Sequence, residues 1–334
     1  MTSTLVVTTI SAPNEVLYAL ANGAKVANAD FIIVGDRKTP ENFKMDGVRY
    51  LSPAEQDKLF PNLSQQIPWN HYARKNIGYL AALGSKGRWL VETDDDNYPM
   101  ESFFQEPNKL SGVRPVTTEG SWLNVYDCFS SGEDIWPRGY PLELLAERQH
   151  QPIRYGSELV MEPCLVQGLA DDNPDVDAVF RMTRQLPFVF DKTVKPVRLS
   201  SGNWCPFNSQ NTWIRRDVAV LAYLPSFCSF RMTDIWRSFV AQRCLWEQGE
   251  GVVFVAPTVR QERNEHNLLK DFEDEVSGYV KNAFIASLLD ETKLTGDYAT
   301  DITRCYEALV KADIIPALEL PLLNAWLREI DALV

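Results

Sequence analysis

The sequence predicts an α/β fold with a mostly parallel central sheet flanked by helices, followed by a helical region. Residues 5–10 and 31–34 are short apolar, β-branched runs of the kind that form buried strands. Between them, Val16, Leu20 and Ala24 share one face of a helix. A strand, a helix and a strand within about 35 residues make a βαβ unit, which places the two strands in parallel.

The same alternation continues further along the chain. Residues 70–83 have the apolar spacing of a helix that ends at Gly84, and residues 89–91 follow as a buried strand. A second helix of this kind over residues 233–246 leads into a strand at residues 251–255. These elements extend the predicted α/β core.

Two parts of the chain depart from this alternation. From about residue 107 to 209, Pro, Asp and aromatic residues are frequent and no long amphipathic helix stands out, so we expect short strands and substrate loops. The last part is helical in pattern, with an apolar stripe that includes Leu322 and Trp326. We therefore divide the chain into an α/β domain at residues 1–265 and a helical region at residues 266–334.

Composition limits the partners that we expect. The 334 residues carry a formal net charge of −12, and the hydrophobic share of 45% is ordinary for a globular protein. Such a charge repels phosphate backbones, so we expect no nucleic-acid partner. No apolar run approaches the roughly 20 residues of a spanning helix, so we expect no transmembrane segment. An anionic substrate needs a local cation to offset the overall charge.

The cysteines indicate a compartment. There are six, and none are spaced as a C-x-x-C pair. We interpret them as reduced core thiols and expect a cytoplasmic protein, with a peripheral place at a membrane that carries the acceptor as the alternative. The N-terminal residues have neither the basic region nor the cleavage site of a signal peptide.

Three consecutive aspartates, Asp94, Asp95 and Asp96, follow the strand at residues 89–91. In an open α/β sheet, ligands bind at the carboxyl ends of the strands. Carboxylate oxygens suit a hard cation such as Mg²⁺ or Mn²⁺, and such an ion offsets the charge of a diphosphate. The sequence therefore predicts a metal site here. The alternative is an acidic turn in which Asp95 faces solvent and Asp96 starts the next helix.

The helix before these aspartates carries two cations. Its segment Ala-Arg-Lys-Asn-Ile-Gly, residues 73–78, resembles the Ala-Arg-Asn-x-Gly helix of family-2-like GT-A glycosyltransferases, from which it departs by the extra residue Lys75. In those enzymes this helix faces the nucleotide. The resemblance implies that Arg74, Lys75 and Asn76 lie at the nucleotide, with the two cations at its diphosphate. The alternative is a pair of solvated cations on a helix surface.

Longer motifs resemble one family more specifically. They lie at residues 34–40 (VGDRKTP), 93–97 (TDDDN), 136–142 (WPRGYPL), 175–178 (DVDA), 206–211 (PFNSQN), 234–237 (DIWR) and 241–243 (AQR). Together they resemble the STELLO glycosyltransferases, formerly a domain of unknown function, over roughly Val6 to Glu275. Plant members of that family are Golgi membrane proteins linked to cellulose synthase assembly. We expect this chain to be a free-standing form without their membrane anchor.

The resemblance implies a GT-A core and assigns roles by position. Asp36, after the second strand, is implied to hydrogen-bond the base or ribose. Asp94 is implied to contact the ribose or a metal-bound water, and Asp96 to ligate the metal, with Asp95 beside them. The residues implied to border the nucleoside, after the first strand, are Thr8, Thr9 and Ser11.

Two further assignments concern catalysis and the metal. The helix that begins at Thr233 resembles the acidic segment that supplies the catalytic base of inverting GT-A enzymes, which implies that Asp234 is the base. The alternative is a helix-start residue that favours the helix dipole. His266 follows the last strand, where GT-A enzymes often have a further metal ligand, and the alternative for it is a surface or core histidine.

The acceptor is expected in the irregular half of the chain. Sugars present C–H faces that stack on aromatic rings, although most tryptophans are equally expected in a core. The residues that the family-like motifs assign to acceptor or sugar binding are Trp136, Arg138, Asn208, Gln210 and Trp236.

These features predict a metal-dependent glycosyltransferase. It would transfer a sugar from a nucleoside diphosphate sugar to a hydroxyl of a glycan or glycolipid, with Mg²⁺ or Mn²⁺. One alternative is a nucleotidyltransferase of related fold, although residues 8–13 lack the glycine-rich basic loop of such enzymes. The other alternative is a non-catalytic family member that acts as an assembly partner.

Overall fold

The structure is a computed structural model that describes residues 3–148, 152–262 and 267–333. Its strands are β1 (Ser3–Thr8), β2 (Asp30–Val34), β3 (Arg49–Leu51), β4 (Trp89–Thr93), β5 (Asn97–Pro99), β6 (Leu110–Thr117), β7 (Arg154–Tyr155), β8 (Leu159–Met161), β9 (Leu165–Asp171), β10 (Val197–Leu199), β11 (Asn211–Arg215) and β12 (Val252–Gln261).

Its α-helices are α1 (Glu15–Val26), α2 (Pro53–Leu59), α3 (Pro61–Ser64), α4 (Lys75–Leu83), α5 (Leu145–Arg148), α6 (Ala178–Thr183), α7 (Thr233–Glu247), α8 (Leu268–Glu291), α9 (Tyr298–Lys311) and α10 (Glu319–Leu333). Two short 3-10 helices, η1 (Tyr72–Arg74) and η6 (Phe230–Met232), lie beside the site described below.

One large sheet organises the molecule, in the order β3-β2-β1-β4-β11-β9-β12-β10-β6-β7. Strands β3, β2, β1 and β4 are mutually parallel, as the βαβ pattern predicts. Strand β11 then enters between β4 and β9 in the opposite direction to both. The predicted α/β class is confirmed, but the sheet is mixed beyond β4 rather than mostly parallel, because β11 runs antiparallel to β4 and β9, and β10 runs antiparallel to β12.

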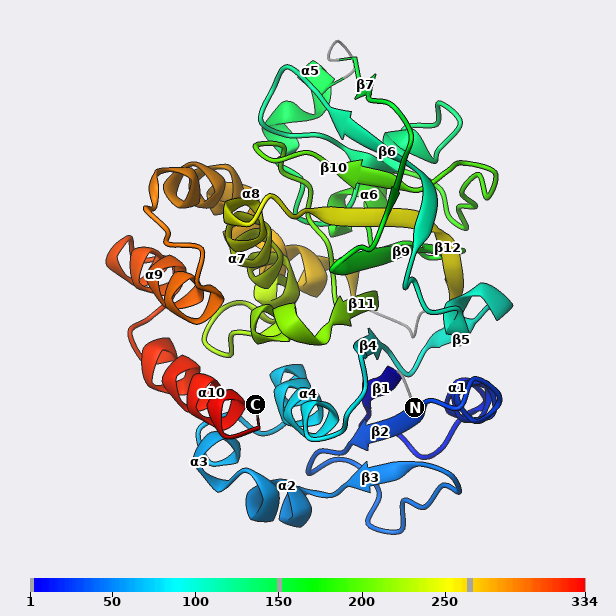
Figure 1. Ribbon diagram of the computed structural model, residues 1–334, viewed down its shortest axis with the longest axis vertical. Helices are drawn as coiled ribbons and strands as arrows, with labels where there is room; N and C mark the ends of the chain where they lie inside the picture. The colour runs from blue at the N-terminus through cyan, green and yellow to red at the C-terminus, as the bar shows by residue number, and fades with distance from the viewer. Residues whose placement is uncertain (1–2, 149–151, 263–266, 334) are drawn as a thin grey trace.

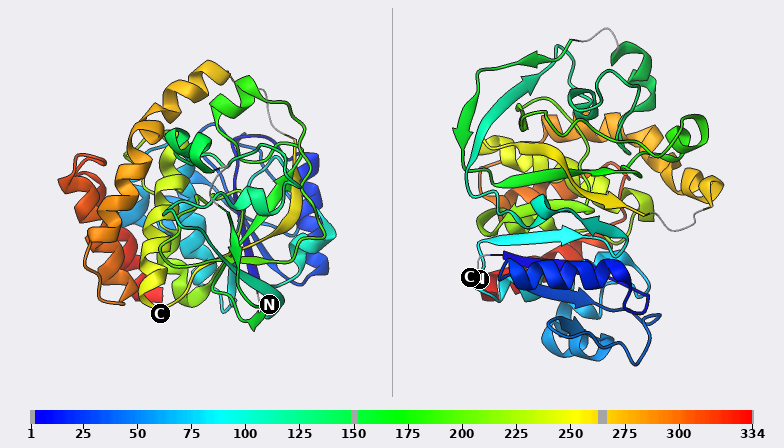
Figure 2. Two further views of the ribbon diagram at one scale, coloured as in Figure 1. Left: turned by 90° about the horizontal axis from the view of Figure 1, so that it is seen from above. Right: turned by 90° about the vertical axis from the view of Figure 1, so that its right-hand side faces the viewer.

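The strands send alternate side chains to two cores on opposite faces of the sheet. Val6, Ile32 and Leu90 belong to the larger core, on the side of α4, α7 and the C-terminal helices. Val7 and Ile33 belong to the smaller core, which α1 covers. Figure 1 shows α1 alone on one side of β1 and β2, with α4 on the other, and Figure 2 turns the α1 side toward the viewer.

Most of the predicted elements form, with shifted ends. The helix predicted at 70–83 begins as η1 and continues as α4, because His71 caps η1 by accepting a hydrogen bond from the backbone of Ala73. The strand predicted at 89–91 continues to Thr93 as β4. The irregular segment contains short strands as predicted, and one of them, β9, is fully buried near the middle of the sheet.

The C-terminal part is helical, as predicted, and shares the larger core. Trp326 of α10 is buried together with residues of α4 and α7. At the start of α10, the Glu319 carboxylate accepts hydrogen bonds from the backbone of Ser226 and Phe227. The predicted boundary between residues 265 and 266 stays a prediction. Within the described ranges, no helix is both long and apolar enough to cross a membrane.

Candidate active site

The ends of the parallel strands bring the sequence-predicted polar residues to one edge of the sheet. Thr8 and Thr9 end or follow β1, Asp36 follows β2, and Asp94 follows β4. Parallel register makes these ends adjacent, because Thr8 pairs with Val34 and Val6 with Glu92. The strand order therefore gathers residues that lie more than eighty positions apart.

Two cavities lie along this edge. The first, called here the β1–β2 cavity, measures about 240 Å³ and is lined by residues 8–10, 34–36 and 70–72, with Lys38, Arg74, Asp95 and Phe230. The second, the acidic cavity, measures about 260 Å³ and is lined by Thr8, Tyr72, Asp94, Asp95, Asp96, Arg138, Ser209, Phe230, Arg231, Asp234 and Gln261. Because Thr8, Tyr72, Asp95 and Phe230 line both, the two cavities adjoin.

The three strand-end acids, Asp94, Asp95 and Asp96, all reach the acidic cavity but differ in their partners. The Lys75 ammonium donates to Asp94 at 2.8 Å. The Thr9 hydroxyl donates to Asp95, and the Gln261 amide donates to both carboxylate oxygens of Asp96 at 3.2 and 3.1 Å.

The electrostatics of these acids depend on burial. Burial raises the pKa of Asp94, against the opposing effect of the Lys75 ammonium. Burial likewise raises the pKa of Asp95, with the Thr9 hydrogen bond acting in the other direction. A cation in the acidic cavity would favour the ionised form of both carboxyls.

The donor chemistry of the strand-end acids fits a hard divalent cation. Carboxylate oxygens are the ligands that Mg²⁺ uses, and Mg²⁺ commonly binds through one or two carboxylates plus water and substrate phosphates. Within the described part of the chain, no three acidic, histidine or cysteine side chains converge closely enough to hold a metal by themselves. A bound ion would therefore draw its remaining ligands from water and phosphate. The predicted ligand His266 lies outside the described residues.

Arg74 does not have the position that the sequence predicts. Its buried guanidinium donates to the Gln56 side chain at 2.7 Å, to the Ser64 hydroxyl, and to the backbone carbonyls of Ser64 and Ile67. It also lies over the Trp69 ring, 3.4 Å from the centroid. The residue borders the β1–β2 cavity, but its hydrogen bonds serve the segment before η1 rather than a phosphate.

Lys75 and Asn76 are also buried rather than turned to a ligand. Besides Asp94, the Lys75 ammonium donates to the backbone carbonyl of Ser209 at 3.2 Å. The Asn76 side chain exchanges two hydrogen bonds with the backbone of Leu224. Both predicted nucleotide contacts are corrected: Lys75 neutralises an acid of the site, and Asn76 ties α4 to the chain before η6.

Arg138 forms a second charged group, called here the arginine clamp, with Asp175 and Asp234. Its guanidinium donates twice to Asp175, at 2.8 Å each, and twice to Asp234, at 3.1 Å each. It also donates to the backbone carbonyl of Arg231. All five guanidinium N–H groups are thereby engaged, so Arg138 is unavailable for the acceptor contact that the sequence predicts.

Asp234 borders the acidic cavity but is held by the clamp. Its carboxylate also accepts a hydrogen bond from the backbone N–H of Ser209 at 3.1 Å. Burial by itself raises the pKa of Asp234, but the charge and hydrogen bonds of Arg138 outweigh burial and lower it. A carboxylate with a depressed pKa is a weak proton acceptor, so the geometry disfavours the predicted role as general base.

The remaining predicted acceptor residues are structural. The Trp136 and Trp236 indoles are buried and donate to Asp177 and Asn282 respectively. Asn208 and Gln210 are buried in hydrogen bonds to neighbouring side chains. None of these four residues is among those that line the two cavities.

The predicted nucleoside residues lie close together. Thr8 and Thr9 line the β1–β2 cavity with Asp36, whose carboxylate accepts from the backbone of Arg37 and His71. Ser11 lines neither cavity, and its backbone N–H donates to the Thr9 hydroxyl at 3.1 Å.

Sequence reasoning missed an aromatic cluster between the cavities. His71, Tyr72 and Phe230 pack together, with ring centroids 4.8 to 5.9 Å apart. The Tyr72 hydroxyl also accepts from the backbone N–H of Asp234 at 2.9 Å. No spacing rule joins residues 71 and 230, so only the fold brings them together.

Comparison with known proteins supports the family resemblance. Residues 231–333 match the model of the family described as STELLO glycosyltransferases. The chain is 29% identical over 277 residues to the Arabidopsis thaliana protein named "Probable glycosyltransferase STELLO2" and 28% identical to its STELLO1 counterpart. The predicted resemblance to the STELLO family is confirmed. Each alignment covers 77% of this chain and 35% of the relative, so the chain spans about a third of the STELLO proteins' length.

Solved structures give weaker likenesses. Glucosyl-3-phosphoglycerate synthase from Mycobacterium tuberculosis matches with a TM-score of 0.42 and 10% identity, over 84% of this chain and 80% of that one. The same enzyme in complex with Mg²⁺ and uridine diphosphate matches with a TM-score of 0.40 and 14% identity, over 91% and 79%. At such scores, nothing about the chemistry of this chain follows from them.

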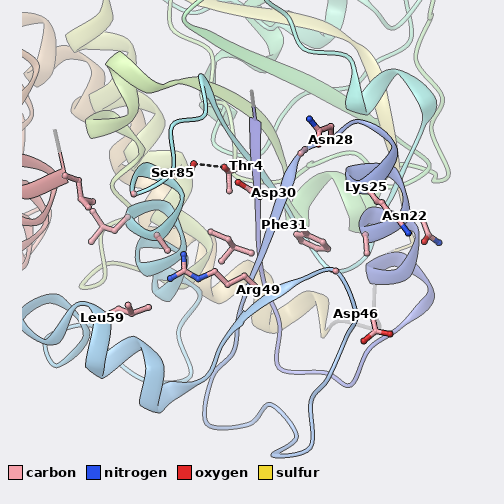
Figure 3. A pocket seen from close by; sticks show the side chains of 18 of the residues that line it. Thr4, Asn22, Lys25, Asn28, Asp30, Phe31, Asp46, Arg49, Leu59 and Ser85 are labelled. Atoms are coloured by element: carbon pink, nitrogen blue, oxygen red, sulfur yellow. Dashed lines mark hydrogen bonds between the residues drawn. The ribbon is translucent and has the colours of Figure 1, made fainter. Parts of the chain in front are cut away.

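A cavity larger than these two lies elsewhere. It measures about 940 Å³ and is lined by Thr4, Asp30 and Arg49, near the starts of β1, β2 and β3. Figure 3 shows this cavity, with the hydrogen bond between Thr4 and Ser85 on its wall. It is at the opposite end of the strands from the strand-end acids, so size alone does not identify the site.

Proposed function

We propose that the chain is a metal-dependent glycosyltransferase of the GT-A type that uses a nucleoside diphosphate sugar. One observation carries the proposal: the β1–β2 cavity adjoins the acidic cavity at the carboxyl ends of β1, β2 and β4. A nucleoside diphosphate sugar has the same division, an aromatic base at one end and a charged diphosphate with a polar sugar at the other. The likeness to proteins named as glycosyltransferases supports the same reaction class.

Each cavity would receive a different part of the nucleoside diphosphate sugar. The nucleoside would enter the β1–β2 cavity, beside Thr9 and Asp36, and the diphosphate would cross Asp95 into the acidic cavity. Asp95 and Asp96 would hold the divalent cation, since both line the acidic cavity and the Thr9 hydroxyl that donates to Asp95 is neutral. A bound Mg²⁺ or Mn²⁺ would offset the charge of the diphosphate leaving group.

Lys75 and Asp94 would set the charge of this centre. The Lys75 ammonium is buried and 2.8 Å from Asp94, so it favours the ionised carboxylate where burial opposes it. Asp94 is thereby held at the cavity wall as a hydrogen-bond acceptor for a ribose or sugar hydroxyl. Lys75 contributes a fixed positive charge behind the wall without contacting the donor.

Asp234 would bind a hydroxyl rather than remove its proton. Its two oxygens accept three hydrogen bonds from Arg138 and Ser209, and a carboxylate has about four acceptor positions. One acceptor position therefore remains on a residue that lines the acidic cavity. Because its pKa is lowered, the residue suits a hydroxyl of the sugar or acceptor, which favours a retaining transfer that needs no general base.

The test is ligand-dependent stability followed by activity. Uridine and guanosine diphosphate sugars are added with and without Mg²⁺ or Mn²⁺, and the true donor should raise the melting temperature of the protein only when the metal is present. The donor that stabilises the protein should also be hydrolysed slowly by it. Pyrophosphate release from a nucleoside triphosphate and a sugar phosphate would favour the nucleotidyltransferase alternative. No stabilisation by any nucleotide would favour the non-catalytic assembly partner.

The acceptor and the location of the protein stay predictions. We propose a glycan or glycolipid hydroxyl as the acceptor, because the acidic cavity is polar and offers carboxylates to sugar hydroxyls.

A further inference from the structure

His71 forms part of the wall of the β1–β2 cavity and is fixed there on several sides. Its ring is stacked with that of Tyr72, with an interplanar angle of 4°, and it meets the Phe230 ring edge-on at 5.4 Å. Its backbone N–H donates to the Asp36 carboxylate at 3.3 Å. The ring therefore has one preferred orientation in the cavity wall.

The hydrogen bonds of the ring determine its tautomer. Nδ1 accepts a hydrogen bond from the backbone N–H of Ala73 at 3.1 Å, so it carries no proton. Burial lowers the pKa of His71, against the opposing charge of Asp36, so the ring is neutral near pH 7. A neutral ring with an unprotonated Nδ1 carries its proton on Nε2. Among the described residues, Nε2–H meets no hydrogen-bond acceptor of the protein.

We propose that His71 reads the base of the donor, and that its Nε2–H selects a base with a carbonyl group at that edge, namely uracil. This inference rests on the proposed function, since it assumes that the β1–β2 cavity receives the nucleoside. A single N–H donor pairs with a carbonyl oxygen but opposes the amino group that cytosine and adenine present at the corresponding position. With uracil the Nε2–H group gains a hydrogen bond, and beside the amino group of cytosine or adenine it stays unpaired, which is unfavourable. Both effects favour uracil.

The dimensions of the cavity separate uracil from guanine, which also has a carbonyl group. The volume of about 240 Å³ lies below the usual range of roughly 300–1,000 Å³ for ligand pockets, which favours a single-ring base. Phe230, 48% exposed, borders the cavity on the side that also opens to the acidic cavity. Its ring offers a face for stacking that is indifferent to base identity.

Two substitutions separate the reading role of His71 from its structural role. In His71→Asn, the amide oxygen lies near the former Nδ1 and can keep the hydrogen bond from Ala73, but no donor reaches the position of Nε2. In His71→Gln, the longer side chain places an amide N–H near the former Nε2 but gives up the bond to Ala73. A purely structural histidine predicts that Asn is the milder change in every measurement.

The experiment is calorimetric titration of the full chain with UDP, CDP, GDP and ADP, each with Mg²⁺. Wild type should bind UDP most tightly. His71→Asn should keep the melting temperature but lose about two- to tenfold of its preference for UDP over CDP, the worth of one hydrogen bond. His71→Gln should keep the preference while its melting temperature falls. Equal UDP and CDP affinities in wild type, or an unchanged preference in His71→Asn, would overturn the inference.

Phe230→Ala supplies the comparison that locates the base. It should weaken all four nucleotides by a similar factor, at least about fivefold, because stacking does not depend on base identity. Phe284→Ala, which removes a similarly exposed ring (53%) from α8, should leave all affinities unchanged. If no nucleotide binds wild type, both the inference and the proposed function fail. If nucleotides bind without base preference, only the inference fails.

Discussion

The strand-end acids and the arginine clamp border the same acidic cavity, yet their carboxylates are held in opposite ways. Asp95 and Asp96 accept from a hydroxyl and an amide, and burial raises the pKa of Asp95. Asp234 shares the Arg138 guanidinium with Asp175, and its pKa is lowered. The charge of Asp234 is compensated by a buried guanidinium, whereas the hydroxyl that donates to Asp95 is neutral.

This difference shows which carboxylates are available to a ligand. An acid whose charge is already compensated by a buried guanidinium gains little from a bound metal ion. Its lowered pKa also makes it a weak proton acceptor. Asp95, whose pKa is raised by burial and which accepts from a neutral hydroxyl, gains from an added cation. Position at a strand end therefore matters less for ligand binding than the charge of the neighbouring side chain.

Breaking the clamp should have the largest effect. Arg138→Met leaves Asp175 and Asp234 buried without their cation, so we expect the free energy of unfolding to fall by about 3–5 kcal/mol. The measurement is urea unfolding followed by fluorescence. Arg184→Met is the matched control, because Arg184 pairs with Asp134 at the surface and should cost no more than about 1 kcal/mol. Equal losses in the two variants would contradict the buried role of Arg138.

Removing a strand-end acid should affect binding rather than stability. Asp96→Asn retains an oxygen for Gln261 but removes the charge that would hold the cation, so Mg²⁺-dependent UDP affinity should fall by about tenfold or more. The metal-free protein should be no less stable, because carboxylate repulsion is relieved. Calorimetry with and without Mg²⁺ checks both. Asp46→Asn, in the distant cavity, should leave the affinity unchanged.

The two acids of the clamp offer a matched pair. Asp234→Asn and Asp175→Asn each weaken hydrogen bonds to the same guanidinium, so both should lower stability by about 1.5–3 kcal/mol. Only Asp234 borders the acidic cavity, so only Asp234→Asn should alter sugar transfer. Hydroxyl binding predicts a higher donor or acceptor KM. A fall in turnover of about 10²–10⁴-fold with unchanged KM would instead restore Asp234 as the general base.

The sequence was most informative where local pattern and function coincide. The apolar runs of β1, β2 and β4 and the helix between the first two were predictable, because buried parallel strands leave continuous apolar stretches. The placement of Asp94–Asp96 at a strand end followed from the same reasoning. The direction of β11 was not predictable, because pairing partners distant in sequence leave no local pattern.

The partners of the charged residues could not be predicted from local sequence patterns either. Arg74 and Lys75 have the sequence of a phosphate-binding helix, but Gln56, Ser64 and Asp94 are already their partners. Arg138 meets Asp175 and Asp234 across 37 and 96 residues, a pairing that no spacing indicates. Motif resemblance found residues close to the site, while the fold decided which of them still face a cavity.

The smallest predicted effect is a difference in the pH dependence of stability. The folded-state pKa of Asp95 is raised above its ordinary value of 3.8, so its contribution to stability is greatest below pH 3.8 and is lost as pH rises through the raised pKa. The pKa of Asp234 is lowered, so its contribution is present above pH 3.8 and is lost only as pH falls through the lowered pKa. The two groups therefore predict pH dependences of opposite sign.

Denaturant unfolding at a series of pH values, without divalent cations, measures these signs. Asp95→Asn should gain stability relative to wild type as pH rises from about 4 to 7, because the variant no longer pays for ionising a buried carboxyl. Asp234→Asn should show a constant deficit over the same range that narrows only below about pH 4. Added Mg²⁺ should reduce the relative gain of Asp95→Asn, since the ion stabilises the ionised acid. Parallel pH profiles for wild type and both variants would show that the strand-end acids and the arginine clamp are not electrostatically different.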